Sequence, residues 1–431
     1  MATFSIPLTG LKADSTSLNT VANDLANMNT TAFKSQTTNF SDLFYQEIGT
    51  TGAGDPIQVG AGVRVISNET DFTQGSINST GNSTDVALDG NGFFVLSNGS
   101  GGYEYTRAGN FTLLNAAGGL VTSNGLSVMG YPAVNGAVNT NAPLTAISIP
   151  VGQVQQPQAT TSMNMTANLD SASVTGTQFP SEITVYDSLG QAHIAGITFQ
   201  QTATNTWSYS VALPAADYTT PASAPAAIAG SMTFDTSGNL ATVNGKNVGT
   251  AAGDVSSIAL ALSTAPPSAT ALADGAAVLS INWNLLGPSG TPTISQVDTA
   301  SAVSGTSQNG HASGQYQSFS IGSDGTVSVT YSNGQIQNVG QLALANVANA
   351  QGLMLLGNGD YSATLASGAA VVGTSGTAGL ASVQDSALEA SNVNVSTEFS
   401  NLIVAQRAFE ANAKSVTTFD TIMQDTINMV H

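Results

Sequence analysis

Residues 399–430 of the 431-residue chain read FSNLIVAQRAFEANAKSVTTFDTIMQDTINMV and contain neither glycine nor proline. Apolar side chains recur along this stretch in alternating steps of three and four residues. This spacing gathers them on one seam of a helix and favours coiled-coil packing. The pattern predicts one long C-terminal helix with Asn394 as its N-cap. The predicted seam includes Phe399, Leu402, Phe409, Val416, Met423, Ile427 and Val430, with Ile403 on a second apolar edge beside it.

A shorter stripe lies near the N-terminus, and the glycines and prolines confine long helices to the two ends. Residues 49–379 hold 44 of the 45 glycines and every proline except Pro7, whereas residues 11–48 and 380–431 hold none. A glycine costs roughly 1 kcal/mol and a proline roughly 3 kcal/mol inside a helix, so the middle is predicted to be β-structure with tight turns. The N-terminal stripe consists of Leu11, Leu18, Val21, Leu25 and Met28.

Each stripe is too narrow to form the core of a domain alone. The two are therefore predicted to pair with each other and then with neighbouring molecules. The alternative is an ordinary helical hairpin within one chain. Isolated helices are marginally stable in water, so both ends are expected to be poorly ordered in the monomer. Ser386 and Glu389 have the S-x-x-E spacing of a capping box, which is predicted just before the C-terminal helix.

Turn dipeptides between short alternating runs organise the middle of the chain. Val86–Leu96 reads as strand, turn and strand, with a hairpin turn at Gly90-Asn91-Gly92. Ile183–Leu213 is predicted to be a meander of antiparallel strands. Pro214–Gly230 and Ala265–Gly275 are predicted to be long surface loops.

The composition excludes several classes of partner and site. Only 8% of residues are charged, and the formal net charge is −19 with seven lysines and arginines. Binding to nucleic acid or to an anionic membrane surface needs clustered basic residues, so neither is expected. The absence of cysteine excludes disulfides and thiolate metal sites. The sequence contains no run of about 18 apolar residues, so no membrane insertion is expected, and the N-terminus does not resemble a Sec signal.

No group of residues in the sequence indicates catalysis. His193, His311 and His431 have no second histidine or carboxylate at a spacing typical of a ligand set, so each is predicted to be a surface or loop residue. Gly245-Lys246 lacks the rest of a phosphate-binding loop. The acidic residues are scattered, as expected for a solvated surface. We therefore predict that the protein is not an enzyme and has no catalytic residue, metal ion or cofactor.

The stretch from Ala22 to Lys34, ANDLANMNTTAFK, resembles the N-terminal signature of the bacterial flagellar rod and hook proteins, usually N-N-I-A-N-x-x-T-x-G-F-K. Asp24 replaces the usual asparagine, and Ala32 replaces the usual glycine, which argues against a positive-φ turn there. Ala387–Asn394 and Asn401–Arg407 are similar to the C-terminal signature of this family. The signature residues are Ala22, Asn23, Ala26, Asn27, Phe33, Lys34, Ser391, Asn392, Val393, Gln406 and Arg407.

Motifs in the middle extend the resemblance to the hook members of the family. Gly92-Phe93-Phe94 and Tyr105–Phe111 are similar to segments of the family's inner β-domain. Val185–His193, VYDSLGQAH, is similar to a V-Y-D-S-x-G-x-x-H segment in the outer domain of hook members, which the shorter rod members lack. The likeness spans both ends and most of the middle, and is weakest over residues 200–310.

The resemblance implies a mainly β fold with α-helical coiled-coil termini and nested, discontinuous domains. Two β-rich domains and a terminal helical domain are expected, with a boundary near Val151–Thr161 and with Trp207 and Trp283 packed in the outer domain. The expected parts are a terminal helical coiled-coil domain of residues 1–30 and 391–431, a connecting segment of 31–74 and 376–390, an inner β-domain of 75–158 and 304–375, and an outer β-domain of 159–303.

The function that the resemblance implies is structural. A subunit of this kind polymerises into the hook, a curved hollow helical tube that acts as a universal joint and transmits motor torque from rod to filament. The implied partners are copies of the chain itself, the distal rod, hook–filament junction proteins, the hook cap and the flagellar export apparatus. The implied location is the extracellular flagellum beside the basal body, reached by the flagellar type III route without a cleaved signal peptide. The alternatives are a distal-rod protein, or a secreted β-rich adhesin or carbohydrate-active protein.

Overall fold

The computed structural model describes residues 5–50, 55–97, 99, 101–114 and 118–429, so the predictions for Val430 and His431 lie outside the described residues. The chain forms two compact units. None of the helices in the described ranges combines the length and apolarity needed to span a membrane. The first unit comprises Met1–Val151, Ser318–Thr330 and Ile336–His431, and the second comprises Gly152–Gln317 and Tyr331–Gln335.

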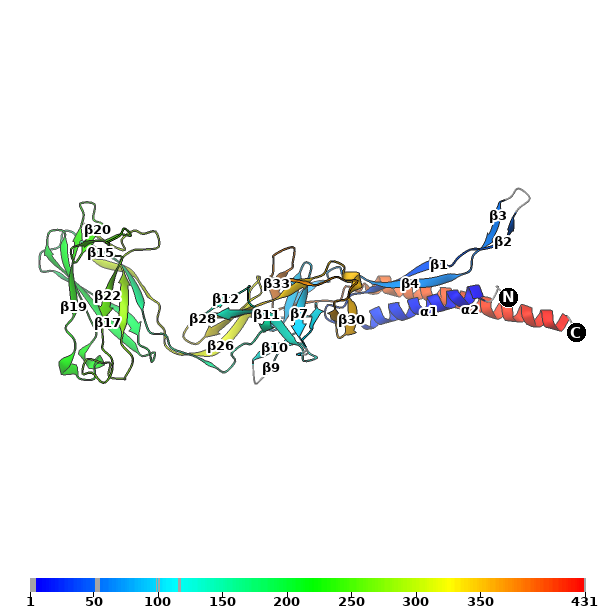
Figure 1. The fold of residues 1–431 in the computed structure, drawn as a ribbon, viewed down its shortest axis with the longest axis horizontal. Helices are drawn as coiled ribbons and strands as arrows, with labels where there is room; N and C mark the ends of the chain where they lie inside the picture. Colours follow the sequence, from blue (N-terminus) through cyan, green and yellow to red (C-terminus); the bar gives the residue numbers. More distant parts are fainter. Residues whose placement is uncertain (1–4, 51–54, 98, 100, 115–117, 430–431) are drawn as a thin grey trace. The chain divides into compact units, whose positions relative to one another are not determined.

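Two long helices pack side by side in the first unit, α1 (Ser5–Ala26) and α2 (Val395–Met429). Figure 1 shows them lying along each other, with α2 continuing beyond the described start of α1. Asn412 of α2 contacts Asp14 in the first half of α1, whereas Glu398 acts electrostatically on Asp24 near its end. The two helices are therefore antiparallel, and the predicted pairing of the two ends is present within one chain.

A long β-ribbon accompanies the helices. β1 (Gln36–Asp42) and β4 (Val63–Thr70) are antiparallel, and both contact α1. β2 (Gln46–Thr50) and β3 (Pro56–Val59) form a second antiparallel pair between them in sequence. The N-terminal segment without glycine or proline is thus only partly helical, because its second half pairs as strands.

The rest of the first unit is a β-domain. Its main sheet has the strand order β27-β28-β11-β7-β8-β31-β30, and Phe93, Tyr105 and Tyr361 pack in its core. The strands are β5 (Ile77–Ser79), β6 (Val86–Asp89), β7 (Phe93–Ser97), β8 (Tyr103–Thr106), β9 (Thr112–Leu114), β10 (Gly119–Val121), β11 (Ser127–Val134), β12 (Ala137–Val138), β13 (Thr145–Ala146), β27 (Thr326–Tyr331), β28 (Ile336–Leu342), β29 (Leu344–Asn346), β30 (Met354–Gly357), β31 (Asp360–Ser362), β32 (Val371–Gly373), β33 (Ser382–Asp385) and β34 (Ala387–Glu389), with a short 3₁₀ helix η3 (Ala350–Gly352).

The second unit has two sheets around one apolar core. One sheet has the order β16-β17-β18-β19-β20-β21, and β15 is central in the other. Alternate residues of β17 are buried, and Trp207 and Trp283 lie fully buried in the core, as predicted. The elements are β14 (Val154–Gln155), β15 (Ser162–Asp170), β16 (Gln178–Tyr186), β17 (Ala192–Ala203), β18 (Thr206–Ala212), η1 (Ala215–Asp217), η2 (Pro221–Ser223), β19 (Ile228–Phe234), β20 (Leu240–Val243), β21 (Lys246–Asn247), β22 (Ser257–Ala261), β23 (Ser280–Asn284), β24 (Ile294–Val297), β25 (Ala302–Gln308) and β26 (Gly314–Ile321), the last continuing into the first unit.

Local turn chemistry predicts the meander correctly and one hairpin wrongly. β16, β17 and β18 pair in sequence order within the predicted Ile183–Leu213 meander. The predicted hairpin at Gly90-Asn91-Gly92 does not form, since β6 pairs with β33 and β7 pairs with β8, β11 and β29. The two glycines take φ values of 114° and 132° and send the chain from one sheet to another.

The return from the second unit also differs from the expected layout. The layout that the family resemblance implies places this return at residue 304, but β25 pairs with β15 and the second unit continues to Gln317. No turn motif in the sequence predicts where the second unit ends, because β25 is held by a strand, β15, that lies far away in sequence. The helices, the connecting segment and most of the expected inner β-domain belong to one compact unit, and the four-part layout stays a prediction.

Candidate functional site

The start of α2 is capped as the sequence predicts. Asn394 Oδ1 accepts hydrogen bonds from the backbone N–H of Ser396 at 3.1 Å and of Thr397 at 3.2 Å, which satisfies two of the free donors at the helix start. The predicted Ser386–Glu389 capping box is wrong. Ser386 has a positive φ of 54°, and Glu389 ends β34, which pairs with β5. A distant pairing overrides the local S-x-x-E pattern.

Part of the predicted seam lies between the two helices. Gly10 packs so closely on α2 that an added Cβ would lie 2.8 Å from Asn412 Nδ2, and Asn412 donates to Asp14 Oδ2 at 2.8 Å. A glycine, usually unfavourable in a helix, here permits the close approach. The seam residues that are buried or half-buried are Leu11, Leu18, Val21, Leu25, Leu402, Phe409 and Val416.

The remaining described seam residues are exposed. Every residue of α2 from Thr421 to Met429 is exposed, although the apolar stripe continues through this segment. Met28 lies beyond the end of α1 and is also exposed. The exposed apolar residues of α2 are Val395, Phe399, Ile403, Val404, Ile422, Met423, Ile427 and Met429. We call Ile422, Met423, Ile427 and Met429 the distal stripe.

The two sequence signatures meet at a buried carboxylate. Lys34 Nζ lies 2.6 Å from Glu389 Oε1, and Arg107 Nε lies 2.9 Å from Glu389 Oε2. Arg107 also donates to the carbonyl oxygens of Gly90, Gly92 and Leu88. Burial lowers the pKa of Lys34, and the Glu389 carboxylate opposes that shift. These contacts join the N-terminal signature, the inner β-domain and the strand before α2.

Asn392 makes a second connection between the signatures. Its Oδ1 accepts the backbone N–H of Ser35 at 2.8 Å, and its Nδ2 donates to the carbonyl oxygen of Asp71 at 2.8 Å. The backbone N–H of Asn392 donates to the carbonyl of Phe33 at 3.3 Å. Ser391 is a local partner, because its Oγ accepts from the backbone N–H of Val393. Asn392, just before α2, therefore connects the start of α2 to the segments before β1 and after β4.

The other signature residues make local contacts or are exposed. Asn27 Nδ2 donates to the carbonyl of Asn23 at 2.9 Å as α1 ends. Arg407 pairs with Glu410 on the surface. Ala22, Ala26 and Gln406 are exposed on the helices. Figure 1 shows that the end of α1 and the start of α2 lie next to the β-domain of the first unit, which contains Arg107.

Two departures from the family signature have structural consequences. Ala32 has a φ of 56°, so the left-handed turn forms without glycine, contrary to the expectation. Its backbone N–H donates to the carbonyl of Glu389 at 2.8 Å. Asp24 is fully buried, and its Oδ2 accepts the N–H of Gln36 at 2.8 Å, while Oδ1 has no hydrogen-bond partner among the described residues. Burial raises the pKa of Asp24 to about 6, opposed by the Gln36 bond and aided by Glu398.

Sequence reasoning missed Glu389 and misplaced His193. His193 is buried in the second unit between Asp187 and Asp217, not on the surface as predicted. His311, by contrast, is half-buried near the end of β25. In a chain with so few charges, a glutamate between apolar residues of a strand is a signal for a buried ion pair. No comparable sequence pattern predicts the contact between Asp217 and His193, because only the tertiary fold brings these two residues together.

Comparisons with known proteins agree over the whole chain. Family models match residues 153–311 (flagellar basal body protein FlaE D2 domain), 87–168 (flagellar hook protein FlgE/F/G D1 domain) and 384–429 (flagellar basal body rod FlgEFG protein C-terminal). The chain is 35% identical to the flagellar hook protein FlgE of Escherichia coli K12, covering 99% of both, and 33% identical to that of Treponema pallidum, covering 98% of both. The crystal structure of Helicobacter pylori flagellar hook protein FlgE2 is similar in fold, with a TM-score of 0.54 and 14% identity, covering 72% of this chain and all of that one.

Proposed function

The chain belongs to the flagellar hook protein family, and from this premise we propose that it polymerises into the hook through its terminal helices. The observation that supports this mechanism is the distal stripe, four apolar side chains on a helix end that is exposed throughout. Fully burying one such side chain stabilises an assembly by about 1.5–3 kcal/mol. A second copy of the chain supplies a matching surface.

The geometry of such an assembly follows from the asymmetry of the stripe. The half-buried part of the seam is paired with α1, whereas the distal stripe extends past it. We propose that a neighbour covers the distal stripe with a different surface of its own. Contacts between unlike surfaces generate open helical polymers when the rotation does not close. We therefore infer a tube in which the helices form the inner layer.

Helix ordering and polymerisation are coupled in this proposal. Fixing the backbone of one residue costs roughly 1–2 kcal/mol, and residues 421–429 at the end of α2 are all exposed. Contacts with several neighbours offset that cost. The inner helical layer then resists twist and transmits torque, while the β-rich units allow bending, as a universal joint requires.

The wider assignments follow from the family. We propose that the chain contacts the distal rod at one end of the hook, hook–filament junction proteins at the other, and the hook cap during assembly. We further propose that it reaches this extracellular site through the flagellar type III export apparatus. Its role is then structural and requires no enzyme activity.

The distal stripe provides the direct test. Met423→Glu combined with Ile427→Glu places two charges on it, and electron microscopy of the purified chain at rising concentration and salt then measures tube formation. We expect no tubes from this variant and normal tubes from Gln424→Glu combined with Asn428→Asp, which adds the same charge at neighbouring exposed polar positions. Both variants should keep the circular dichroism of the wild-type monomer. Normal tubes from the first variant would contradict the proposal.

A further inference from the structure

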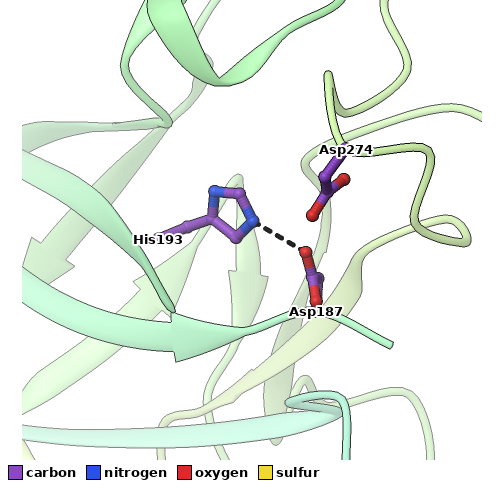
Figure 2. A group of neighbouring side chains, drawn as sticks. All are labelled: Asp187, His193 and Asp274. Carbon is purple, nitrogen blue, oxygen red and sulfur yellow. Dashed lines mark hydrogen bonds and ion pairs between the residues drawn. The ribbon is translucent and has the colours of Figure 1, made fainter. Parts of the chain in front are cut away.

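A histidine and two aspartates in the second unit converge from separate segments. Figure 2 shows the imidazole of His193 and the carboxylates of Asp187 and Asp274 facing one another. The ligand atoms of these three side chains all lie within 4.8 Å of one another. His193 belongs to β17, Asp187 follows β16, and Asp274 lies in the loop before β23. This group is separate from the helices and signatures that support the proposed function.

The buried aspartate is held in position by its own turn. Asp187 Oδ1 accepts the backbone N–H groups of Leu189 at 2.8 Å and Gln191 at 3.0 Å. Its second oxygen, Oδ2, is left facing His193 Nε2 at 3.0 Å. Gly190 completes the turn with a φ of 84°. The side chain is fully buried, so its orientation does not depend on solvent.

The other ring nitrogen of His193, Nδ1, lies beside a third carboxylate. Asp217 Oδ2, at the end of η1, lies 2.9 Å from His193 Nδ1. A carboxylate in this place accepts the Nδ1–H of the tautomer whose Nε2 lone pair is directed at Asp187 and Asp274. Histidines that bind metal ions almost always have such a partner on the second nitrogen. Asp217 would therefore position the ring of a metal-binding His193, with Nε2 as the ligand atom.

The loop that carries Asp274 is fastened against the other two segments. The backbone N–H of Ala277 donates to Ser188 Oγ at 2.9 Å, and that of Ala273 donates to the carbonyl of Asp217 at 2.9 Å. These bonds hold two like-charged carboxylates, Asp187 and Asp274, in apposition. Among the described residues, no lysine or arginine forms an ion pair with any of these aspartates. Two ionised carboxylates placed in this way repel each other, and either a shared proton or a bound cation removes that repulsion.

We propose that Asp187, His193 and Asp274 bind a divalent transition-metal cation of the zinc class, with water as the fourth ligand. One imidazole and two carboxylates suit such an ion, whereas magnesium and calcium prefer oxygen ligands alone. Bonds of about 2.0–2.2 Å to a tetrahedral ion place ligand atoms about 3.3 Å apart. The 3.0 Å separation of His193 Nε2 and Asp187 Oδ2 is close to that value. The bound ion would fasten the β16–β17 turn to the 272–277 loop and stiffen the second unit.

The test measures Zn²⁺ binding to the full-length chain by calorimetry after removal of metal with a chelator, with the visible spectrum of bound Co²⁺ as a second measurement. We expect one ion per chain, a tetrahedral Co²⁺ spectrum and a higher unfolding temperature with Zn²⁺. Asp274→Asn changes an exposed ligand and should weaken Zn²⁺ binding at least tenfold. His193→Gln should abolish Zn²⁺ binding. If one of the two variants folds poorly, the other still provides the test.

Two control variants locate the binding. Asp298→Asn removes an exposed carboxylate of the same unit, and His311→Gln removes a histidine outside the group; both should bind Zn²⁺ like the wild type. The proposal is overturned if the wild-type chain binds no Zn²⁺, since a proton then holds the cluster together. Equal affinities for Asp274→Asn and Asp298→Asn, or loss of binding in His311→Gln, would also overturn it.

Discussion

Glu389 lies between Lys34 and Arg107, with its side chain and that of Lys34 fully buried. Removing one partner of a buried ion pair is costly because it leaves uncompensated charge in the interior. The cluster joins segments that are more than three hundred residues apart in sequence, as the separation of 355 between Lys34 and Glu389 shows. Its loss should therefore loosen the attachment of both helices to the β-domain.

Glu389→Gln is expected to destabilise the first unit by about 3–5 kcal/mol. The substitution preserves the shape of the side chain and removes the charge that both cations face. Denaturant unfolding followed by far-UV circular dichroism measures the effect. The matched control is Glu410→Gln, whose partner Arg407 is largely exposed, and it should change stability by less than about 1 kcal/mol. Similar effects from the two variants would show that the cluster is not important for stability.

Ala32 has a backbone conformation that costs an L-residue about 1–2 kcal/mol. Ala32→Gly should relieve this strain and raise the free energy of unfolding by about 1 kcal/mol, after the greater freedom of glycine in the unfolded chain is included. The control, Ala22→Gly, places glycine at an exposed helical position and should lower stability by about 1 kcal/mol. Changes of the same sign in both variants would contradict this account.

Asp24 predicts a stability that depends on pH. Its pKa rises from 3.8 to about 6 on folding, so the folded state favours the protonated carboxyl. The stabilisation is fully present below pH 3.8 and is lost as the pH rises through about 6. Asp24→Asn lacks this titration and should be more stable than the wild type at pH 7. The advantage should vanish near pH 3.8, which unfolding experiments at both pH values can measure; a constant difference would refute the assignment.

The α1–α2 pair shows that one helix can use its apolar stripe in two ways. Leu402 is half-buried in the part of α2 that runs beside α1, whereas Met423 is exposed. Apolar spacing alone does not distinguish these two uses, because the same seam continues along the whole of α2. Tertiary contact with α1 decides which part of the stripe is covered within the described chain.

Charged substitutions at Leu402 and Met423 should therefore have different effects. Leu402→Glu should lower the thermal stability of the monomer as well as prevent tube formation. Met423→Glu should leave the thermal stability unchanged and impair only tube formation. Thermal unfolding of the unassembled chain, with electron microscopy of the same samples, separates the two. Equal loss of monomer stability in both variants would mean that the distal stripe is covered within the chain.

The whole chain separates into two units whose connection is suited to deletion. Gln158 and His311 form an isolated antiparallel bridge, with N–H to O distances of 3.0 and 2.9 Å in the two directions. Two strands paired in this way can be closed by a two-residue turn such as Asn-Gly. Residues 159–310, which contain both tryptophans, can then be removed without cutting the first unit.

Replacing residues 159–310 by Asn-Gly should leave the first unit folded and able to assemble. The helices and the ion pairs of Glu389 with Lys34 and Arg107 all remain, so tubes are expected, with bending altered by the absence of the second unit. Circular dichroism and electron microscopy measure both outcomes. In the intact chain, tryptophan fluorescence should report the unfolding of the second unit alone, because Trp207 and Trp283 are both in its core. An unfolded deletion variant would show that the two units depend on each other.

Much of this organisation is determined by the sequence itself. The absence of glycine and proline confines long helices to the ends, the three-and-four spacing locates the seam, and Asn394 marks the start of α2, because each is a local property of the backbone. Consecutive antiparallel strands with short turns, as in the 183–213 meander, are also local. The signature motifs indicate the family because their residues lie close together in sequence.

Only the tertiary structure decides which distant residues meet. It pairs β6 with β33 instead of β7, places Glu389 between Lys34 and Arg107, and joins Asp217 and Asp274 to His193. It also separates the buried part of the helical seam from the distal stripe. The physical reason is that sheet pairing, burial and charge compensation are long-range, so their partners depend on how the entire chain packs and leave no periodic pattern in the sequence.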